Sequence, residues 1–255
     1  MKSAQNRLPR DLNAVSATII LFGYLIAPAL CILWIAVIAI LVTRLQGIHA
    51  NDQILRVIHD IMPAISILTP FISGGAAVLI SLWLIPKSLK DTSPNGAAWV
   101  RGSWRAIAEG FVIGVILGAV ATVMSKAMTH HVDYRDMSPV VQMLLRPGLL
   151  QVLSAVSIVL SAVSIVLCGP PAEEIVFRGV LFGGYRKSFG PIWATLLTTL
   201  LFLALHLPKV LYYMPALAGA SGASLAALWC RLRSGAIGPA VALHVGYNAL
   251  ALSFF

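Results

Sequence analysis

Long stretches of apolar residues, separated by short polar segments, dominate this sequence. The four longest hold roughly 18 or more residues with almost no charge, enough for a helix to cross a hydrocarbon core of about 30 Å. Shorter apolar stretches follow in the last third of the chain. The pattern predicts an all-α polytopic membrane protein with about eight transmembrane helices. The long stretches are 16–43, 61–86, 106–125 and 149–168, and the shorter ones are 171–185, 191–206, 214–230 and 235–255.

The composition agrees with a fold surrounded by lipid. Hydrophobic residues make up 59% of the 255 residues and charged residues 11%, against about 25% charged residues in soluble proteins. The apolar run after Lys2, Arg7 and Arg10 is longer than the core of a signal peptide, so we expect it to remain as a helix. The whole chain, 1–255, is predicted to be a single integral membrane domain.

The net charge of +9 does not indicate nucleic-acid binding, because the Lys and Arg residues are dispersed among short loops. The expected partner of these charges is the lipid bilayer. If eight helices cross from a cytosolic N-terminus, eight basic residues fall inside and nine outside, leaving Arg178 out of the count. The positive-inside rule therefore decides the orientation only weakly.

Two other features of the first two-thirds of the chain concern packing and metals. Gly110, Gly114 and Gly118 repeat at four-residue intervals, which predicts a helix face that a neighbouring backbone can approach closely. The loop histidines lack compact ligand spacing such as HExxH, so we predict no metal site and no cofactor. They are His49, His59, His130 and His131.

Ionisable groups enter the apolar stretches after residue 168, where each is expensive unless it is paired or functional. The run 169–179, GPPAEEIVFRG, is expected to end one helix at its proline pair and to open another. Glu174 and Arg178 have the i, i+4 spacing of an ion pair. Glu173 then lacks a local partner and is a candidate general base.

Two further polar pairs occur at one-turn spacing, Phe202 with His206 and His244 with Asn248. If the chain turns near Phe189 and again near 233–235, helical rise places Glu173 and His206 at the same depth. The His244 and Asn248 side chains reach the same half of the membrane. We therefore expect all four polar groups to converge on a pocket that is reached from one side.

In this order, EExxxR, FxxxH and HxxxN resemble the motifs of the CAAX prenyl endopeptidase and bacteriocin-processing (CPBP, or Abi) family of membrane proteases. The resemblance covers residues 169–248. It implies a glutamate-type endopeptidase, in which residues 1–148 are scaffold helices and residues 149–255 the catalytic core. In the implied mechanism, Glu173 and His206 activate water, His244 and Asn248 form the oxyanion hole, and Glu174, Arg178 and Phe202 support the site.

The implied substrate is a membrane-associated or lipidated peptide or protein, with prenylated ones included. A prokaryotic plasma membrane is the simplest expected location. Two alternatives remain open. One is a zinc protease that binds metal through His206, His244 and a glutamate. The other is a non-catalytic membrane binding or immunity protein that keeps the motifs for structure.

Overall fold

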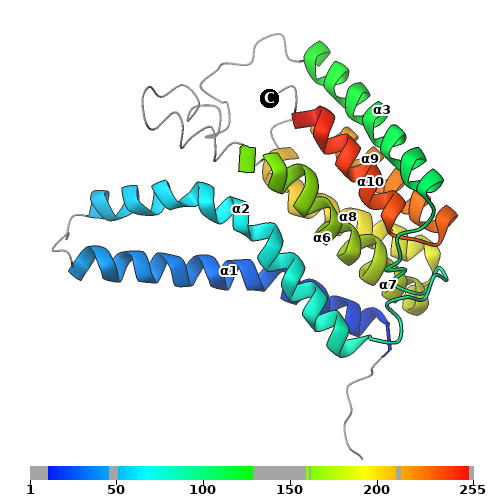
Figure 1. The fold of residues 1–255 in the computed structure, drawn as a ribbon, viewed down its shortest axis with the longest axis horizontal. Coiled ribbons are helices and arrows are strands. Elements are labelled where there is room, and N and C mark those ends of the chain that lie inside the picture. Colours follow the sequence, from blue (N-terminus) through cyan, green and yellow to red (C-terminus); the bar gives the residue numbers. More distant parts are fainter. Residues whose placement is uncertain (1–10, 46–50, 129–158, 161, 211–213, 253–255) are drawn as a thin grey trace, which may run out of the picture.

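The computed structural model describes residues 11–45, 51–128, 159–160, 162–210 and 214–252. Within these ranges the chain forms helices and no strands, which confirms the all-α prediction. Figure 1 shows a hairpin of two long helices beside a bundle formed by the others. The hairpin is α1 (Ala14–Leu45) and α2 (Asn51–Leu84), and the bundle contains α3 (Trp104–Met128), α8 (Pro191–Val210), α9 (Met214–Ser234), α10 (Gly238–Leu252) and a composite helix.

The composite helix carries the EExxxR motif. It consists of η2 (Ser164–Cys168), α6 (Gly169–Glu174), η3 (Ile175–Leu181) and α7 (Phe182–Phe189), where η2 and η3 are π-helical. The prediction that the proline pair ends one helix and opens another is wrong, because the junctions are helical throughout. Proline has no N–H to donate. In the π turn the Gly169 N–H bonds the Ser164 carbonyl, and the chain passes through the prolines without a break.

The predicted turns before α8 and after α9 are confirmed. Gly190, with φ 83°, separates α7 from α8, and Gly235, with φ 64°, follows α9. Glycine adopts this left-handed region without the steric penalty that a Cβ brings. Each turn reverses the chain, so α8 packs back against α7 and α10 packs back against α9.

The glycine stripe on α3 packs against α10, so the predicted close approach of a neighbouring backbone is confirmed. A Cβ at Gly110 or Gly114 would overlap the carbonyl oxygens of Pro239 and Leu243, respectively. A Cβ at Gly118 would lie 2.9 Å from the Tyr247 carbonyl oxygen. The absence of side chains on this face thus lets α3 lie directly against the helix that carries the HxxxN motif.

The outer surface of the protein is apolar, as expected for a membrane protein. On α1, Trp34 is 67% exposed and Leu41 57% exposed, and such a surface suits lipid rather than water. Two described segments are long and apolar enough to cross a membrane, Ala14–Leu45 and Trp104–Met124. Shorter apolar helices cover Leu68–Leu84 and Pro191–His206. The prediction of about eight transmembrane helices is not confirmed, and residues 149–158 of one predicted span lie outside the described residues.

The segment between α2 and α3, residues 85–103, folds back against the bundle, and we call it the end loop. Ala97 and Ala98 in this loop are fully buried. The Ile237 N–H donates to the Ala98 carbonyl at 3.0 Å. Arg231, also fully buried, donates through Nη2 to the carbonyls of Gly96 at 2.7 Å and Ser93 at 2.9 Å. These bonds fix the end loop to α9 and to the start of α10.

Candidate active site

The centre of the site is a buried carboxylate that contacts both an arginine and a histidine. Oε1 of Glu174 lies 2.9 Å from Nη1 of Arg178 and 2.8 Å from Nδ1 of His244. The predicted Glu174–Arg178 ion pair is therefore confirmed. The side chain of Glu174 is 0% exposed and that of Arg178 4% exposed. Charges this deeply buried are stable only when paired. The contact of the same oxygen with His244 joins the composite helix to α10.

Glu173 has a different environment from its neighbour. Its side chain is 22% exposed, and its Oε2 lies 3.8 Å from Nε2 of His244. That oxygen is buried and has no hydrogen-bond partner in the structure. The expectation that Glu173 lacks an ion-pair partner on its own helix agrees with this geometry. The group that faces it belongs to α10, 71 residues later in the sequence.

Phe202 links the remaining parts of the site. The guanidinium carbon of Arg178 lies 4.2 Å from the centre of the Phe202 ring, a cation–π contact. The rings of Phe202 and His206 are 4.6 Å apart, and those of Phe202 and His244 are 5.9 Å apart and nearly perpendicular. Phe202 thus contacts both histidines and the arginine, which gives the FxxxH phenylalanine a defined packing role.

The hydrogen bonds of the two histidines fix which ring nitrogen carries a proton. Nδ1 of His206 lies 2.9 Å from the Phe202 carbonyl oxygen, which can only accept. Nδ1 of His244 likewise faces the carboxylate oxygen of Glu174 that also pairs with Arg178. Both Nδ1 atoms are therefore assigned as donors. In a neutral ring, Nε2 is then a bare acceptor, able to take a proton from water.

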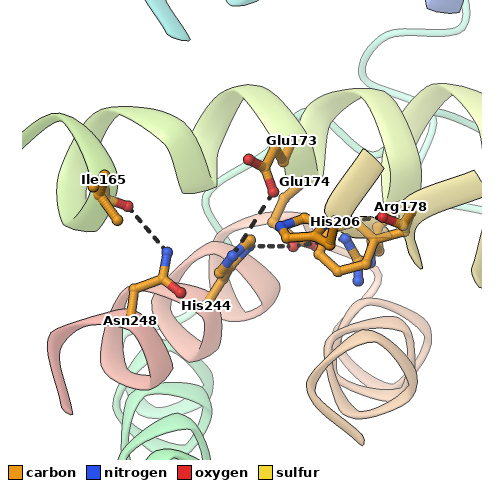
Figure 2. A network of polar contacts seen from close by, with 8 residues as sticks. Ile165, Glu173, Glu174, Arg178, His206, His244 and Asn248 are labelled. Carbon is orange, nitrogen blue, oxygen red and sulfur yellow. Dashed lines mark hydrogen bonds and ion pairs between the residues drawn. The ribbon is translucent and has the colours of Figure 1, made fainter. Parts of the chain in front are cut away.

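Asn248 contacts the π turn of the composite helix. Its Nδ2 donates to the Ile165 carbonyl at 3.0 Å (Figure 2). The residue five positions after Ile165 is Pro170, which has no N–H, and the Gly169 N–H is used by Ser164. Asn248 therefore satisfies a carbonyl that the helix itself cannot. This contact was not predicted from the sequence, although the proline pair was a usable signal for carbonyls without a backbone donor.

Figure 2 shows how the predicted site residues lie relative to one another. The structure brings Glu173, Glu174 and His244 together, and it places Arg178 and His206 around Phe202. Among the residues that the structure describes, no hydrogen bond or ion pair joins His206 to Glu173. The described side chains also contain no group of three or more His, Cys, Asp or Glu arranged to hold a metal ion.

The comparison with known families covers the part of the chain that holds this site. Residues 155–250 match the Rce1-like type II CAAX prenyl endopeptidase family. The resemblance to CAAX-type membrane proteases is thereby confirmed for this part of the chain. No curated protein and no solved structure matches the chain.

The Rce1-like match spans every predicted site residue, from Glu173 to Asn248, and leaves α1, α2 and α3 outside it. The Rce1-like family, together with the apolar helices, identifies the chain as a membrane protein and supports a membrane endopeptidase that acts on a membrane-associated protein.

Proposed function

We propose that the chain is a glutamate-type membrane endopeptidase in which Glu173 is the general base. The observation that carries this proposal is the contrast between the two adjacent carboxylates. Each carboxylate has one oxygen without a hydrogen-bond partner, but Glu174 is fully buried and shares its other oxygen between Arg178 and His244, whereas the Glu173 side chain is 22% exposed. Of the two, Glu173 is therefore the carboxylate that water can reach and that can accept its proton.

In the proposed reaction, water adds to the carbonyl carbon of the scissile peptide bond while Glu173 takes its proton. His206, with Nδ1 bonded to the Phe202 carbonyl, presents Nε2 as a second acceptor that orients the same water. The tetrahedral intermediate then collapses, the C–N bond breaks, and the proton passes from Glu173 to the leaving amine. This sequence requires no group beyond the chain and the water.

The oxyanion hole is proposed to consist of His244 and Asn248. Because Nδ1 of His244 already donates to Glu174, Nε2 can donate to the oxyanion only when the ring is protonated. Before Glu173 takes the proton of the water, the two carboxylates of Glu173 and Glu174 balance the charges of the protonated His244 ring and of Arg178. Asn248 has two amide N–H groups, and one remains for the oxyanion while the other holds Ile165.

The rest of the chain is proposed to support this chemistry. Residues 1–148 serve as scaffold and residues 149–255 as the catalytic core of one domain that crosses the membrane about eight times. The proposed substrates are lipidated or membrane-inserted peptides, with prenylated proteins among them. The proposed location is a prokaryotic plasma membrane.

The test compares cells that produce the wild-type protein with cells that produce Glu173→Gln, at matched levels in the membrane fraction. We expect at least one membrane protein to accumulate uncut in the variant, with its cleaved form reduced by about 10²-fold or more. Identical cleavage patterns would instead support a non-catalytic membrane binding or immunity protein. Loss of cleavage by the wild-type protein in EDTA, with recovery on adding zinc, would support the zinc mechanism.

A further inference from the structure

Basic side chains gather at one end of the helix bundle, which we call the basic end. Here α2, α7 and α9 end, and α1, α3, α8 and α10 begin. Contacts confirm the arrangement, because the Ala14 N–H bonds Ser188 and the Leu12 N–H bonds Ser88. The basic residues at this end are Lys87, Lys90, Arg101, Arg105, Arg186, Lys187, Arg231 and Arg233.

Among the residues that the structure describes, the opposite end carries fewer basic residues than the basic end. On its described helices they are Arg44, Arg56, Lys126 and Lys209. The difference arises from the composite helix, which passes through the proline pair as one element. Arg186 and Lys187 therefore lie at the same end as the end loop, whereas a break at the prolines would have placed them at the other end. For eight separate segments, the positive-inside rule did not decide the orientation. With the composite helix counted as one element, the rule favours a cytosolic location for the basic end.

The catalytic groups lie away from the basic end. Glu173 precedes the end of α7 at Phe189 by 16 residues, which corresponds to roughly 24 Å of helix and somewhat less through the π segment. Asn248 lies only four residues before α10 ends at Leu252. In a hydrocarbon core of about 30 Å, this places the site in the half of the membrane opposite the basic end.

The structure also closes the route from the basic end to the site. The end loop inserts between the two, and a Cβ on Gly179 would lie 2.8 Å from the Ala97 carbonyl oxygen. Between Glu174 and the basic end, residues of the composite helix are buried, with Phe177 1% exposed and Val180 0% exposed. Glu173, on the other side, is 22% exposed.

We infer that the basic end faces the cytosol and that the active site opens toward the non-cytosolic side of the membrane. This inference rests on the proposed proteolytic function and names its substrate class. The substrate is a membrane-anchored peptide whose scissile bond lies in the outer half of the bilayer or just beyond it, as in a translocated segment. A prenylated or otherwise lipidated tail that stays in the cytosol lies on the closed side of the end loop. The inference therefore narrows the substrates proposed above to lipidated or membrane-inserted segments on the non-cytosolic side.

The orientation is tested with single-cysteine variants in a protein whose Cys31, Cys168 and Cys230 are replaced by alanine. Intact cells are treated with a membrane-impermeant maleimide, before and after permeabilisation. We expect Leu45→Cys to be labelled in intact cells and Lys87→Cys only after permeabilisation. The opposite pattern would overturn the orientation.

Access to the site is tested with a membrane-impermeant methanethiosulfonate on Glu173→Cys in intact cells. The matched control is Val176→Cys, on the same helix but 0% exposed. We expect Glu173→Cys to react at least tenfold faster than the control. Equal rates, or reaction of Glu173→Cys only after permeabilisation, would overturn the inference. Labelling needs no turnover, so an inactive protein with this labelling pattern would count against the proposed function alone.

Discussion

One oxygen of Glu174 lies 2.8 Å from Nδ1 of His244, a residue 70 positions later in the sequence. The same oxygen forms an ion pair with Arg178 one turn along its own helix. Glu174 thus connects the two motifs that flank the site. It also determines that Nδ1 of the His244 ring carries the proton, which leaves Nε2 as an acceptor in the neutral ring.

The first prediction concerns Glu174→Gln, which leaves Arg178 buried without a counter-charge. Breaking a buried pair in this way costs about 3–5 kcal/mol, so we expect a markedly lower Tm together with lower kcat. The measurement is thermal unfolding and peptide cleavage of the protein purified in detergent. The control is Glu109→Gln, which removes partly exposed ion pairs to Arg105 and Arg233 worth at most about 1 kcal/mol. Equal effects of the two changes would contradict the assigned role of Glu174.

The second prediction separates two possible roles of Asn248. If its amide stabilises the oxyanion, Asn248→Ala should lower kcat by about 10²–10³ with KM nearly unchanged. If it serves only to satisfy the Ile165 carbonyl, restoring a backbone donor should restore activity. Pro170→Ala supplies such a donor, five residues after Ile165.

The decisive variant is therefore the double change Pro170→Ala with Asn248→Ala, compared with each single change. We expect the double variant to recover part of the Tm lost in Asn248→Ala, because the restored hydrogen bond contributes about 1 kcal/mol to stability. Its kcat should stay low. Recovery of kcat along with Tm would show that Asn248 acts by positioning the π turn, and the oxyanion role would have to be abandoned.

The third prediction concerns the contact between α3 and α10. Gly114→Ala adds a methyl group where the Leu243 carbonyl already lies, so α10 must move, and His244 with it. Such overpacking costs about 1–3 kcal/mol, and we expect lower Tm and lower kcat. Gly75→Ala is the matched control, because nothing lies within 4 Å of its Cβ position, and it should keep or slightly raise stability. A fully active, stable Gly114→Ala protein would contradict this packing.

Local patterns in the sequence predicted much of this arrangement. The turns at Gly190 and Gly235 follow from glycine after an apolar run, and the Glu174–Arg178 pair follows from helical spacing. The glycine stripe predicted a close neighbour without identifying it as α10. Each of these features depends on residues close together in the chain, where spacing alone constrains geometry.

The features that were missed depend on contacts between distant segments. The sequence cannot show that His244 bonds Glu174, because that contact forms only when α10 packs against α6. Nor does it show that the end loop folds back, although Arg231, a charge at the end of an apolar stretch, is a signal for a buried partner. The prediction of a helix break at the prolines was wrong because a π turn changes which backbone N–H groups serve as donors. The missing N–H of the prolines therefore does not interrupt the helix.

The π segment Ile175–Leu181 also sets the rotational phase between the two halves of the composite helix. In an α-helix each residue turns the chain by about 100°, and a π turn accommodates one residue more than an α turn over the same span. If the same residues were wound as an α-helix throughout, Glu173 and Glu174 would rotate by about 100° relative to α7. The carboxylates would then no longer face α10, even though the helix remained intact. The π segment therefore sets the angle at which both glutamates point toward His244.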